Sequence, residues 1–310
     1  MPISLIFFSS AEISLPLFKE LVADDRFEIK AVFCQPDKPA GRKLELKAPA
    51  PKLIAKDHGI PVYQPEKLST ETELLNQLQE DPPDFLLTFA YGQIMRQEWL
   101  DLAAIAPLNV HTSLLPKYRG ASPIQSAILN GDNETGISLM KMVLAMDAGP
   151  VAFQDKVQIN DEMNAGDLHD ELANLAALKV PNHIVSLSKD AQFTEQDESL
   201  VSHCGKVSRE DGFLDFKGNA SDVVQKFKAY SPWPGVWTKF NGKRLKVLDL
   251  SLSNKSLQPG QVLVEEAHLF IGCSEGSLQI HKLQLEGKSP LLAKDFLLGQ
   301  SDFDASTLPS

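Results

Sequence analysis

The stretch that decides the fold is IAPLNVHTSLLPKYRGASP, residues 105–123. It begins with an apolar run that predicts a buried strand, and it continues into a loop rich in Ser, Pro and Gly, which end strands. Asn109 and His111 lie two residues apart at the end of this strand. Because side chains alternate along a strand, both should lie on one face of the sheet. The sequence therefore predicts a carboxamide and an imidazole side by side at a strand end.

A carboxamide beside an imidazole suits acyl chemistry. The amide N–H can donate to a developing oxyanion, and the imidazole can move a proton at neutral pH. Asp147 lies in the turn Met146-Asp147-Ala148-Gly149-Pro150, after another apolar segment, and is a candidate to polarise His111 or a water. The structural alternative is a histidine hydrogen-bonded in a core turn. The loop that follows His111 and the Asp-Ala-Gly-Pro turn favour catalysis.

The first part of the chain alternates apolar strand patterns with helical patterns, which is typical of a parallel sheet. Strands are predicted at 3–8, 27–33, 61–63, 85–89 and 105–111, with further strands at 137–143 and 151–159. An apolar stripe that begins at Leu168 predicts a helix ending near Pro181. We expect a Rossmann-like, doubly wound α/β domain with a mostly parallel sheet, whose ligands lie at the carboxyl ends of its strands. The sequence contains neither a GxGxxG motif nor a GxxxxGK[ST] motif.

The pattern changes toward the C-terminal part. We expect a catalytic domain at 1–188, a polar linker at 189–205 and a second domain at 206–310. The second domain has short strand patterns, and Asn241-Gly242 between two of them is a strong hairpin signal. A small antiparallel β-barrel of the OB-like type is therefore expected there.

Composition places the chain among ordinary globular proteins, with 43% hydrophobic and 23% charged residues. Its apolar runs are too short to span a bilayer, and the N-terminus has the pattern of a strand rather than a signal peptide. Cys34, Cys204 and Cys273 form no CxxC pair, which favours a reducing compartment and argues against a structural metal. We expect a cytoplasmic protein without a metal or a membrane partner. We also expect a monomer, since nothing suggests an obligate dimer seam.

Charge is distributed unevenly along the chain. The net charge of −11 argues against general nucleic-acid binding. However, residues 38–56 hold six basic side chains and one acidic, and residues 206–310 hold 13 basic and 12 acidic, so the first 205 residues carry −12. Basic surfaces on an acidic body attract phosphate locally, while the body repels non-specific binding. A solvated charged face is the alternative for either set.

With its 109–123 loop and its Asp-Ala-Gly-Pro turn, the chain resembles the folate-dependent formyltransferases, over nearly its whole length. The resemblance implies that Asn109, His111 and Asp147 are catalytic. In formyl transfer an amine attacks the formyl carbon directly. Asn109 would then donate to the developing oxyanion, His111 would share that role and deliver a proton toward the departing nitrogen, and Asp147 would orient a water or His111. No GxSxG nucleophile motif is present.

The resemblance also implies the co-substrate, 10-formyltetrahydrofolate. Its pteridine is expected against the backbone of the loop that contains Phe89, Ala90, Tyr91 and Gly92, and against the loop leading into Asp147. The turn formed by Ser113, Leu114, Leu115 and Pro116 is expected along the folate. Backbone edges and apolar walls suit a flat heterocycle with donor and acceptor edges.

The acceptor implied by the resemblance is methionyl initiator tRNA. A long loop without secondary structure, from Gln35 to about Pro51, resembles the insertion that reaches the acceptor arm in this branch, and within it Lys38, Arg42 and Lys43 would contact the tRNA. In the second domain, Lys206, Arg244, Lys246 and Lys288 would line a phosphate-binding face. Trp233 and Trp237 are interpreted as core or interdomain packing residues rather than as platforms for base stacking.

One segment departs from the family pattern. After the first strand the chain has Ser9-Ser10-Ala11 where the family usually has Gly-Thr-Pro or Gly-Thr-Ser, and the methionyl side chain is expected near this turn. Two other hypotheses stay open: a formyltransferase of the same core that acts on an amino-sugar nucleotide, and a catalytically inactive RNA-binding protein. The basic loop argues against the first, and the presence of Asn109, His111 and Asp147 argues against the second.

Overall fold

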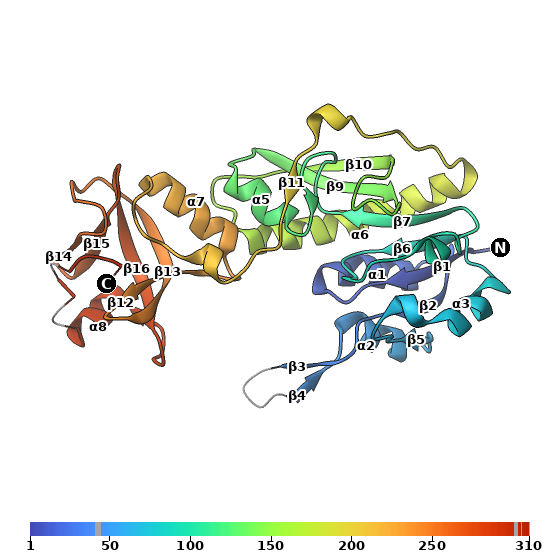
Figure 1. The fold of residues 1–310 in the computed structure, drawn as a ribbon, viewed down its shortest axis with the longest axis horizontal. Coiled ribbons are helices and arrows are strands. Elements are labelled where there is room, and N and C mark those ends of the chain that lie inside the picture. The colour runs from blue at the N-terminus through green and yellow to red at the C-terminus, as the bar shows by residue number, and fades with distance from the viewer. Residues whose placement is uncertain (41–44, 301–302, 305, 310) are drawn as a thin grey trace. The chain divides into compact units, whose positions relative to one another are not determined.

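The structure is a computed structural model that describes residues 1–310 apart from 41–44, 301–302, 305 and 310. The chain forms two compact units (Figure 1). The first comprises Met1–Pro123, Asn133–Ile159 and Leu168–Cys204. The second comprises Ile124–Asp132, Asn160–Asp167 and Gly205–Ser310.

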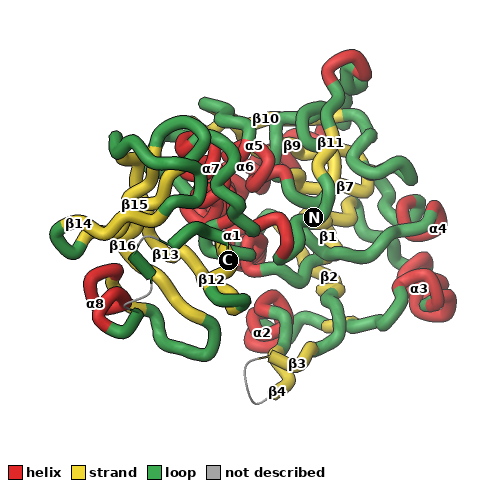
Figure 2. The backbone as a smooth tube through the Cα atoms, turned by 60° about the vertical axis from the view of Figure 1, so that its left-hand side comes forward, coloured by secondary structure: helices red, strands yellow, loops and turns green. Residues whose placement is uncertain are grey.

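The first unit is built on a seven-stranded sheet with the order β10-β9-β7-β6-β1-β2-β5 (Figures 1 and 2). The five strands from β7 to β5 are parallel, whereas β9 and β10 are antiparallel to their neighbours. The bounds are β1 Ile3–Phe8, β2 Phe27–Phe33, β5 Val62–Tyr63, β6 Phe85–Thr88, β7 Ala106–His111, β9 Glu134–Lys141 and β10 Val151–Gln158. The predicted Rossmann-like, mostly parallel sheet is therefore confirmed.

Both faces of this sheet are covered, as apolar side chains on both faces of β1 require. Phe7 stacks on Phe18 of α1, with ring centroids 4.8 Å apart. On the opposite face, Phe8 stacks on Phe33 at 4.6 Å, within a buried cluster that includes Tyr91 and Trp99. The remaining elements of this unit are η1 Glu12–Ser14, α1 Leu15–Ala23, β3 Lys38–Ala40, β4 Glu45–Lys47, α2 Ala50–Asp57, η2 Leu68–Thr70, α3 Thr72–Gln79, α4 Gln97–Leu100, β8 Arg119–Gly120, η3 Glu198–Leu200 and β11 His203–Cys204; α5 Pro123–Leu129 and α6 Ala165–Lys189 belong partly to each unit.

Helix α6 does not end at Pro181 as its sequence predicts; it continues to Lys189. A proline inside a helix removes one backbone hydrogen bond, at a cost of about 3 kcal/mol. Beyond Pro181, however, Ile184 and Leu187 continue the apolar stripe and are buried, at 0% and 2% exposure. The burial of each such side chain contributes about 1.5–3 kcal/mol, which offsets the lost hydrogen bond.

The polar segment after α6 is paired with the first unit. Thr194 forms a β-bridge with Val151, and β11 pairs in parallel with β8. The Arg119 guanidinium is only 6% exposed and binds the Glu198 carboxylate at 2.7 Å. Residues 190–204, most of the predicted linker, thus hold the loop that follows β7.

The second unit contains an antiparallel sheet with the order β12-β13-β16-β15-β14, and β17 pairs with β16. Its elements are η4 Glu210–Gly212, α7 Ala220–Tyr230, β12 Val236–Phe240, β13 Lys243–Ser253, β14 Val262–Glu265, β15 His268–Gly272, β16 Ser277–Leu285, β17 Leu291–Leu292 and α8 Ala293–Leu298. Asn241 and Gly242 join β12 to β13 with φ of 50° and 72°, as a two-residue hairpin turn requires. The expected antiparallel β domain is confirmed. Among the described residues, the recorded ladders do not join β12 to β14 into a closed ring.

Gly120 lies where β8 meets β11, at a φ of +124°. A Cβ atom there would lie 2.1 Å from the Cys204 carbonyl oxygen. We expect Gly120→Ala to lower the free energy of unfolding by about 2 kcal/mol or more, because backbone strain and overlap with Cys204 add together. Urea unfolding followed by circular dichroism measures this loss.

Gly59→Ala is the matched control. Gly59 also has positive φ, +68°, but a Cβ atom there would meet nothing within 4 Å. We expect Gly59→Ala to lower the free energy of unfolding by only about 1 kcal/mol, because backbone strain is its only cost. Equal losses in the two variants would contradict the close approach of β8 to β11.

Candidate active site

The site lies at the carboxyl ends of β6 and β7, where a doubly wound sheet places its ligands. The two strands are parallel neighbours, and Thr88 is the Cα partner of Asn109. His111 is the last residue of β7. Asn109 and His111 therefore share one sheet face, as the sequence predicts, with Thr88 beside them.

His111 and Asp147 come together from distant segments. His111 Nδ1 lies 3.8 Å from Asp147 Oδ2, and the side chains are only 6% and 15% exposed. His111 Nε2 lies 2.9 Å from the Tyr118 carbonyl oxygen. A carbonyl only accepts hydrogen bonds, so we assign a proton to Nε2. Nδ1 is then the ring nitrogen that faces the Asp147 carboxylate and is available for proton transfer.

Asp147 is held in place by the loop that follows β7. Its Oδ2 accepts the backbone N–H of Gly120 at 2.9 Å. Gln196 donates to the carbonyl oxygens of Asp147 and Gly149, at 2.8 Å and 2.7 Å. These bonds fix the carboxylate beside His111.

Asn109 presents its carboxamide at a half-buried position. Within the part of the chain that the structure describes, no hydrogen bond is recorded for this carboxamide. The neighbouring Thr88 hydroxyl is buried, and it too has no partner among the described residues. Buried polar groups are nearly always hydrogen-bonded, so the Thr88 hydroxyl is an exception. The half-buried Asn109 amide beside it is the group that a polar ligand could reach.

Backbone strain gathers around these groups. Ala90, Tyr118 and Asp147 have φ of 54°, 60° and 52°. Such values cost about 1–3 kcal/mol for residues other than Gly, and they persist where the surroundings enforce them. All three residues adjoin the site: Ala90 follows β6, Tyr118 accepts from His111, and Asp147 faces His111.

The residues expected to contact folate differ in accessibility. Phe89 and Tyr91 are buried at 1% exposure, and burial raises the pKa of the Tyr91 hydroxyl, whereas Ala90 and Gly92 are exposed. Tyr91 also anchors the loop, since its carbonyl oxygen accepts from Gln35 Nε2 at 3.0 Å. This loop therefore offers a ligand mainly the backbone between its two buried rings.

The predicted turn after β7 is anchored from below. Ser113 is fully buried and donates to the Lys117 carbonyl oxygen at 2.6 Å, and Leu115 is 5% exposed. The Ser138 hydroxyl accepts the Leu115 N–H at 3.0 Å and donates to the Ser113 carbonyl oxygen at 2.7 Å. Leu114 and Pro116 are the half-buried members of this turn.

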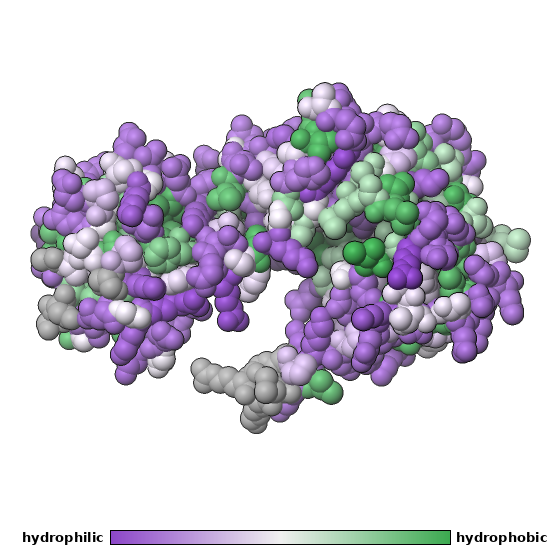
Figure 3. Space-filling model, in the orientation of Figure 1, coloured by the Kyte–Doolittle hydropathy of each residue, from purple (hydrophilic) through white to green (hydrophobic). Residues whose placement is uncertain are grey.

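Exposed apolar side chains flank the strand ends. Ile94, in the loop after β6, is 79% exposed, and Leu144 and Met146, in the loop leading to Asp147, are 63% and 67% exposed. Figure 3 shows apolar patches on the face of the first unit that it presents, over β6 and its neighbours. Exposed apolar side chains beside polar groups are typical of a ligand site.

The segment after β2 contains a short hairpin rather than a loop without secondary structure. Strands β3 and β4 pair antiparallel, with Lys38 opposite Lys47. The Asp37 carboxylate anchors its base, accepting from Gln64 Nε2 at 2.7 Å and Lys52 Nζ at 2.8 Å. These bonds hold the pKa of Asp37 below its ordinary value. Arg42 and Lys43, expected to contact tRNA, lie outside the described residues.

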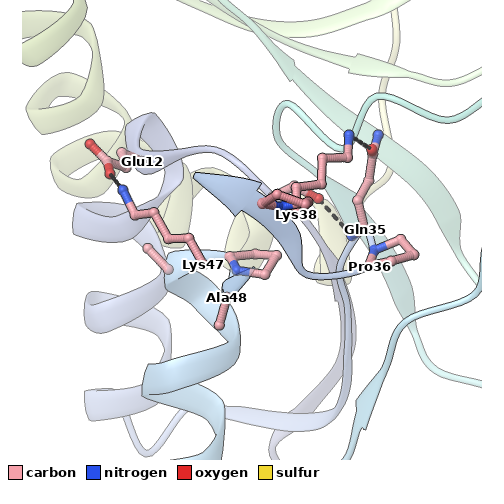
Figure 4. A pocket seen from close by; sticks show the side chains of 10 residues that line it. Glu12, Gln35, Pro36, Lys38, Lys47 and Ala48 are labelled. Atoms are coloured by element: carbon pink, nitrogen blue, oxygen red, sulfur yellow. Dashed lines mark hydrogen bonds and ion pairs between the residues drawn. The ribbon is translucent and has the colours of Figure 1, made fainter. Parts of the chain in front are cut away.

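A pocket of about 250 Å³ lies at the base of this hairpin. Figure 4 shows Lys47 extended to Glu12, and Lys38 beside Gln35. The Lys47–Glu12 distance is 3.2 Å, and Lys38 donates to Gln35 Oε1 at 2.7 Å. Ser10 also lines the pocket. The segment Ser9-Ser10-Ala11, which differs from the family pattern, therefore lies next to the basic hairpin.

In the second unit, Lys206 and Lys288 are exposed, and Arg244 and Lys246 lie two residues apart on β13. Trp237 is 7% exposed, in agreement with a packing role. Trp233 is 54% exposed, so it is not a core residue. Its position in the turn between α7 and β12 holds it outside the core.

Two further observations concern the described residues. No group of three or more His, Cys, Asp or Glu side chains there has a geometry that could hold a metal ion. Within the same residues, no helix is both long and apolar enough to cross a bilayer.

Comparison with known proteins bears on both units. Residues 6–184 match the model of the formyl transferase family, and residues 206–301 match that of the formyl transferase C-terminal domain. The chain belongs to the formyl transferase family. It is 38% identical over 309 residues to a methionyl-tRNA formyltransferase of Dehalococcoides mccartyi, covering 99% of this chain and 98% of that protein. It is 36% identical to one of Geobacter metallireducens, covering 96% of each chain.

Solved structures share the fold of this formyl transferase. An N-formyltransferase of Helicobacter canadensis, in complex with folinic acid and dTDP-3-aminofucose, has a TM-score of 0.66 at 17% identity, over 90% of this chain and 99% of that one. HypX of Aquifex aeolicus, in complex with tetrahydrofolic acid, has a TM-score of 0.64 at 17% identity, over 97% of this chain and 48% of that one. At such identities the likeness shows the fold alone.

The sequence did not indicate the side-chain roles of three residues that shape the site. Thr88 ends an apolar run, and only the strand register places it beside Asn109. Ser138 and Gln154 come from β9 and β10, and both bind the turn after β7. A polar residue at an inward position of an apolar strand was the available signal for Thr88 and Ser138.

Thr88→Val tests whether the hydroxyl lacks a protein partner. The change keeps the branched shape and removes an unpartnered buried polar group, so we expect the free energy of unfolding of the unliganded protein to rise by about 1 kcal/mol. Urea unfolding followed by fluorescence measures it.

Ser138→Ala is the control, because the Ser138 hydroxyl bonds to Leu115, Ser113 and Gln154. Its removal should cost about 1–3 kcal/mol. A Thr88→Val variant destabilised as much as Ser138→Ala would show that Thr88 is already paired in the unliganded protein.

Proposed function

We propose that this formyl transferase transfers a formyl group from 10-formyltetrahydrofolate to the free amino group of methionyl initiator tRNA. The observation that carries the proposal is the identity of 36–38% to methionyl-tRNA formyltransferases along both units. Asn109 and His111 share one face at the carboxyl end of β7, and Asp147 lies beside His111. These three groups suit the chemistry.

The co-substrate supplies an activated formyl group on a folate nitrogen. The residues of the site fit such a group: the half-buried Asn109 amide is available to polar atoms, and the backbone between Phe89 and Gly92 with the exposed Ile94 offers an edge and an apolar wall. Leu114 and Pro116 are the accessible side chains of the turn on the other side of His111.

The mechanism assigns one role to each polar group. The acceptor amine attacks the formyl carbon, a new C–N bond forms, and the bond from that carbon to the folate nitrogen breaks. Asn109 donates its amide hydrogen to the carbonyl oxygen as negative charge develops there. His111 uses Nδ1, the nitrogen not held by Tyr118, to pass the amine proton toward the leaving nitrogen. Asp147 orients His111 and a water near Nδ1.

Basic side chains of both units bind the tRNA. The β3–β4 hairpin presents Lys38, and the sequence between its two strands contains Arg42 and Lys43. In the second unit, Lys206, Arg244, Lys246 and Lys288 provide a phosphate-binding set. Phosphate contacts position the tRNA, and contacts at the amino acid and the end of the stem provide selectivity.

We also propose a domain organisation for this function. The catalytic domain is residues 1–188, the segment 189–205 connects it to the rest, and residues 206–310 form the tRNA-binding domain. We propose that the protein acts in the cytoplasm as a monomer. An amino-sugar nucleotide is the second candidate acceptor, supported by the fold likeness to the Helicobacter canadensis enzyme, but such a small acceptor leaves the basic hairpin without a role.

An acceptor assay tests the proposal. With 10-formyltetrahydrofolate, the purified protein should formylate methionyl initiator tRNA at least about a hundredfold more efficiently than free methionine, since binding energy from remote parts of a substrate raises kcat/KM. Transfer to a dTDP-linked amino sugar, with none to the charged tRNA, would favour the second candidate. Mass spectrometry of each acceptor measures the products.

Asn109→Ala tests the oxyanion role. Loss of one such donor should lower kcat by about 10²–10³, with KM for the tRNA nearly unchanged. Asn109→Asp keeps the shape but replaces the amide donor with an oxygen, so it should be equally impaired. An Asn109→Asp enzyme with wild-type kcat would exclude hydrogen-bond donation by this residue.

A further inference from the structure

A groove of about 310 Å³ in the second unit lies outside the candidate active site. Its walls include Trp233, Trp237, Arg209, Arg244 and Lys246, with the backbone of 234–236 between them. Three of these side chains are cationic, and no acidic residue lines the groove. An aromatic ring among cations is the combination that binds single nucleotides of nucleic acids.

Trp233 is the exposed member of the groove. It is 54% exposed, whereas Trp99 and Trp237 are 3% and 7% exposed. Pro232 and Pro234 flank it and fix the neighbouring backbone φ angles. Because this indole is more than half exposed, its burial contributes little to the stability of the fold. Because the backbone around it is stiff, it can stack on a flat ligand with little loss of conformational entropy.

Contacts with neighbouring residues hold one cation of the groove, Arg244, at a defined position. The Arg244 guanidinium lies over the Trp237 ring, 4.1 Å from its centroid, and Trp237 Nε1 donates to the Arg209 carbonyl oxygen at 2.9 Å. Arg244 also has an acidic neighbour, because its Nη2 lies 3.6 Å from Glu210, whose side chain is 75% exposed. Lys246 has no ion pair recorded within the described ranges. The packed Trp237 thus supports the Arg244 guanidinium in the groove that the exposed Trp233 also lines.

We propose that this groove binds one nucleotide of the tRNA, with its nucleobase stacked on Trp233 and its phosphate held by Arg209, Arg244 and Lys246. The inference rests on the proposed function, since the nucleic acid is the acceptor tRNA. It adds a nucleobase contact to the phosphate contacts of this unit. Charge supports a nucleic acid over an apolar protein segment: the groove carries three cationic side chains in a chain of net charge −11.

The test uses the full-length protein and uncharged initiator tRNA, so that binding is measured without chemistry. Trp233→Ala should weaken the Kd for tRNA between about fivefold and a hundredfold, as loss of one base stack does. Trp233→Phe keeps an aromatic face and should stay within about threefold of wild type. Leu252→Ala is the matched control, because Leu252 is 58% exposed on β13 of the same unit, outside the groove.

Fluorescence gives a signature that a purely structural role would not produce. Stacking should quench the emission of the exposed Trp233 when tRNA binds, and Trp233→Phe should abolish this change. Lys246→Ala should lower the slope of log Kd against log salt by about 1, which is the contribution of one phosphate contact. If Trp233→Ala does not fold, as judged by circular dichroism, the fluorescence comparison decides.

The outcomes separate this inference from the proposed function. A wild-type Kd in folded Trp233→Ala, or quenching that persists in Trp233→Phe, would overturn the groove while leaving formylation of charged tRNA intact. Conversely, tRNA that quenches Trp233 without being formylated when charged would support the groove and overturn the function.

Discussion

The hydrogen bond from the Gly120 N–H to Asp147 Oδ2 is the contact on which the site depends. It joins the loop after β7 to the loop between β9 and β10, and so holds the carboxylate beside His111. The Cys204 carbonyl oxygen also lies close to this glycine, only 2.1 Å from the position that a Cβ atom would occupy. Glycine at 120 therefore serves two constraints at once: packing of the returning segment and placement of the acid.

The segment 190–204 has a larger role than its polar composition indicates. It carries Gln196, which donates to the backbone at Asp147 and Gly149, and Glu198, which binds the buried Arg119 guanidinium. It ends in β11, which pairs with β8. Residues 190–204 thus hold the loop after β7 in place through these contacts, and the chain then continues into the second unit. Rigid support of this kind would keep the proposed catalytic groups within the small tolerance that proton transfer requires.

In each unit, the groups that we propose to bind ligands lie beside packed apolar residues. In the first, Tyr91 is buried, and the backbone beside it carries the exposed edge near Thr88 and Asn109. In the second, Trp237 is buried and carries Arg244 on its ring face. Buried rings orient their neighbours with little loss of side-chain entropy, so ligand-facing groups are held in place without many direct bonds.

The sequence by itself determined the strands of the large sheet and the shared face of Asn109 and His111, and it predicted a site at the carboxyl ends of these strands, because alternation along a strand and ligand placement in a doubly wound sheet are local or topological rules. It also indicated the Asn241-Gly242 hairpin. Only the tertiary structure decided that Thr88 adjoins Asn109, that residues 190–204 pair with the first unit, that helix α6 passes Pro181, and that Trp233 is exposed while Trp237 is buried. These features depend on strand register and on long-range burial, and neither is encoded in the spacing of residues within one segment.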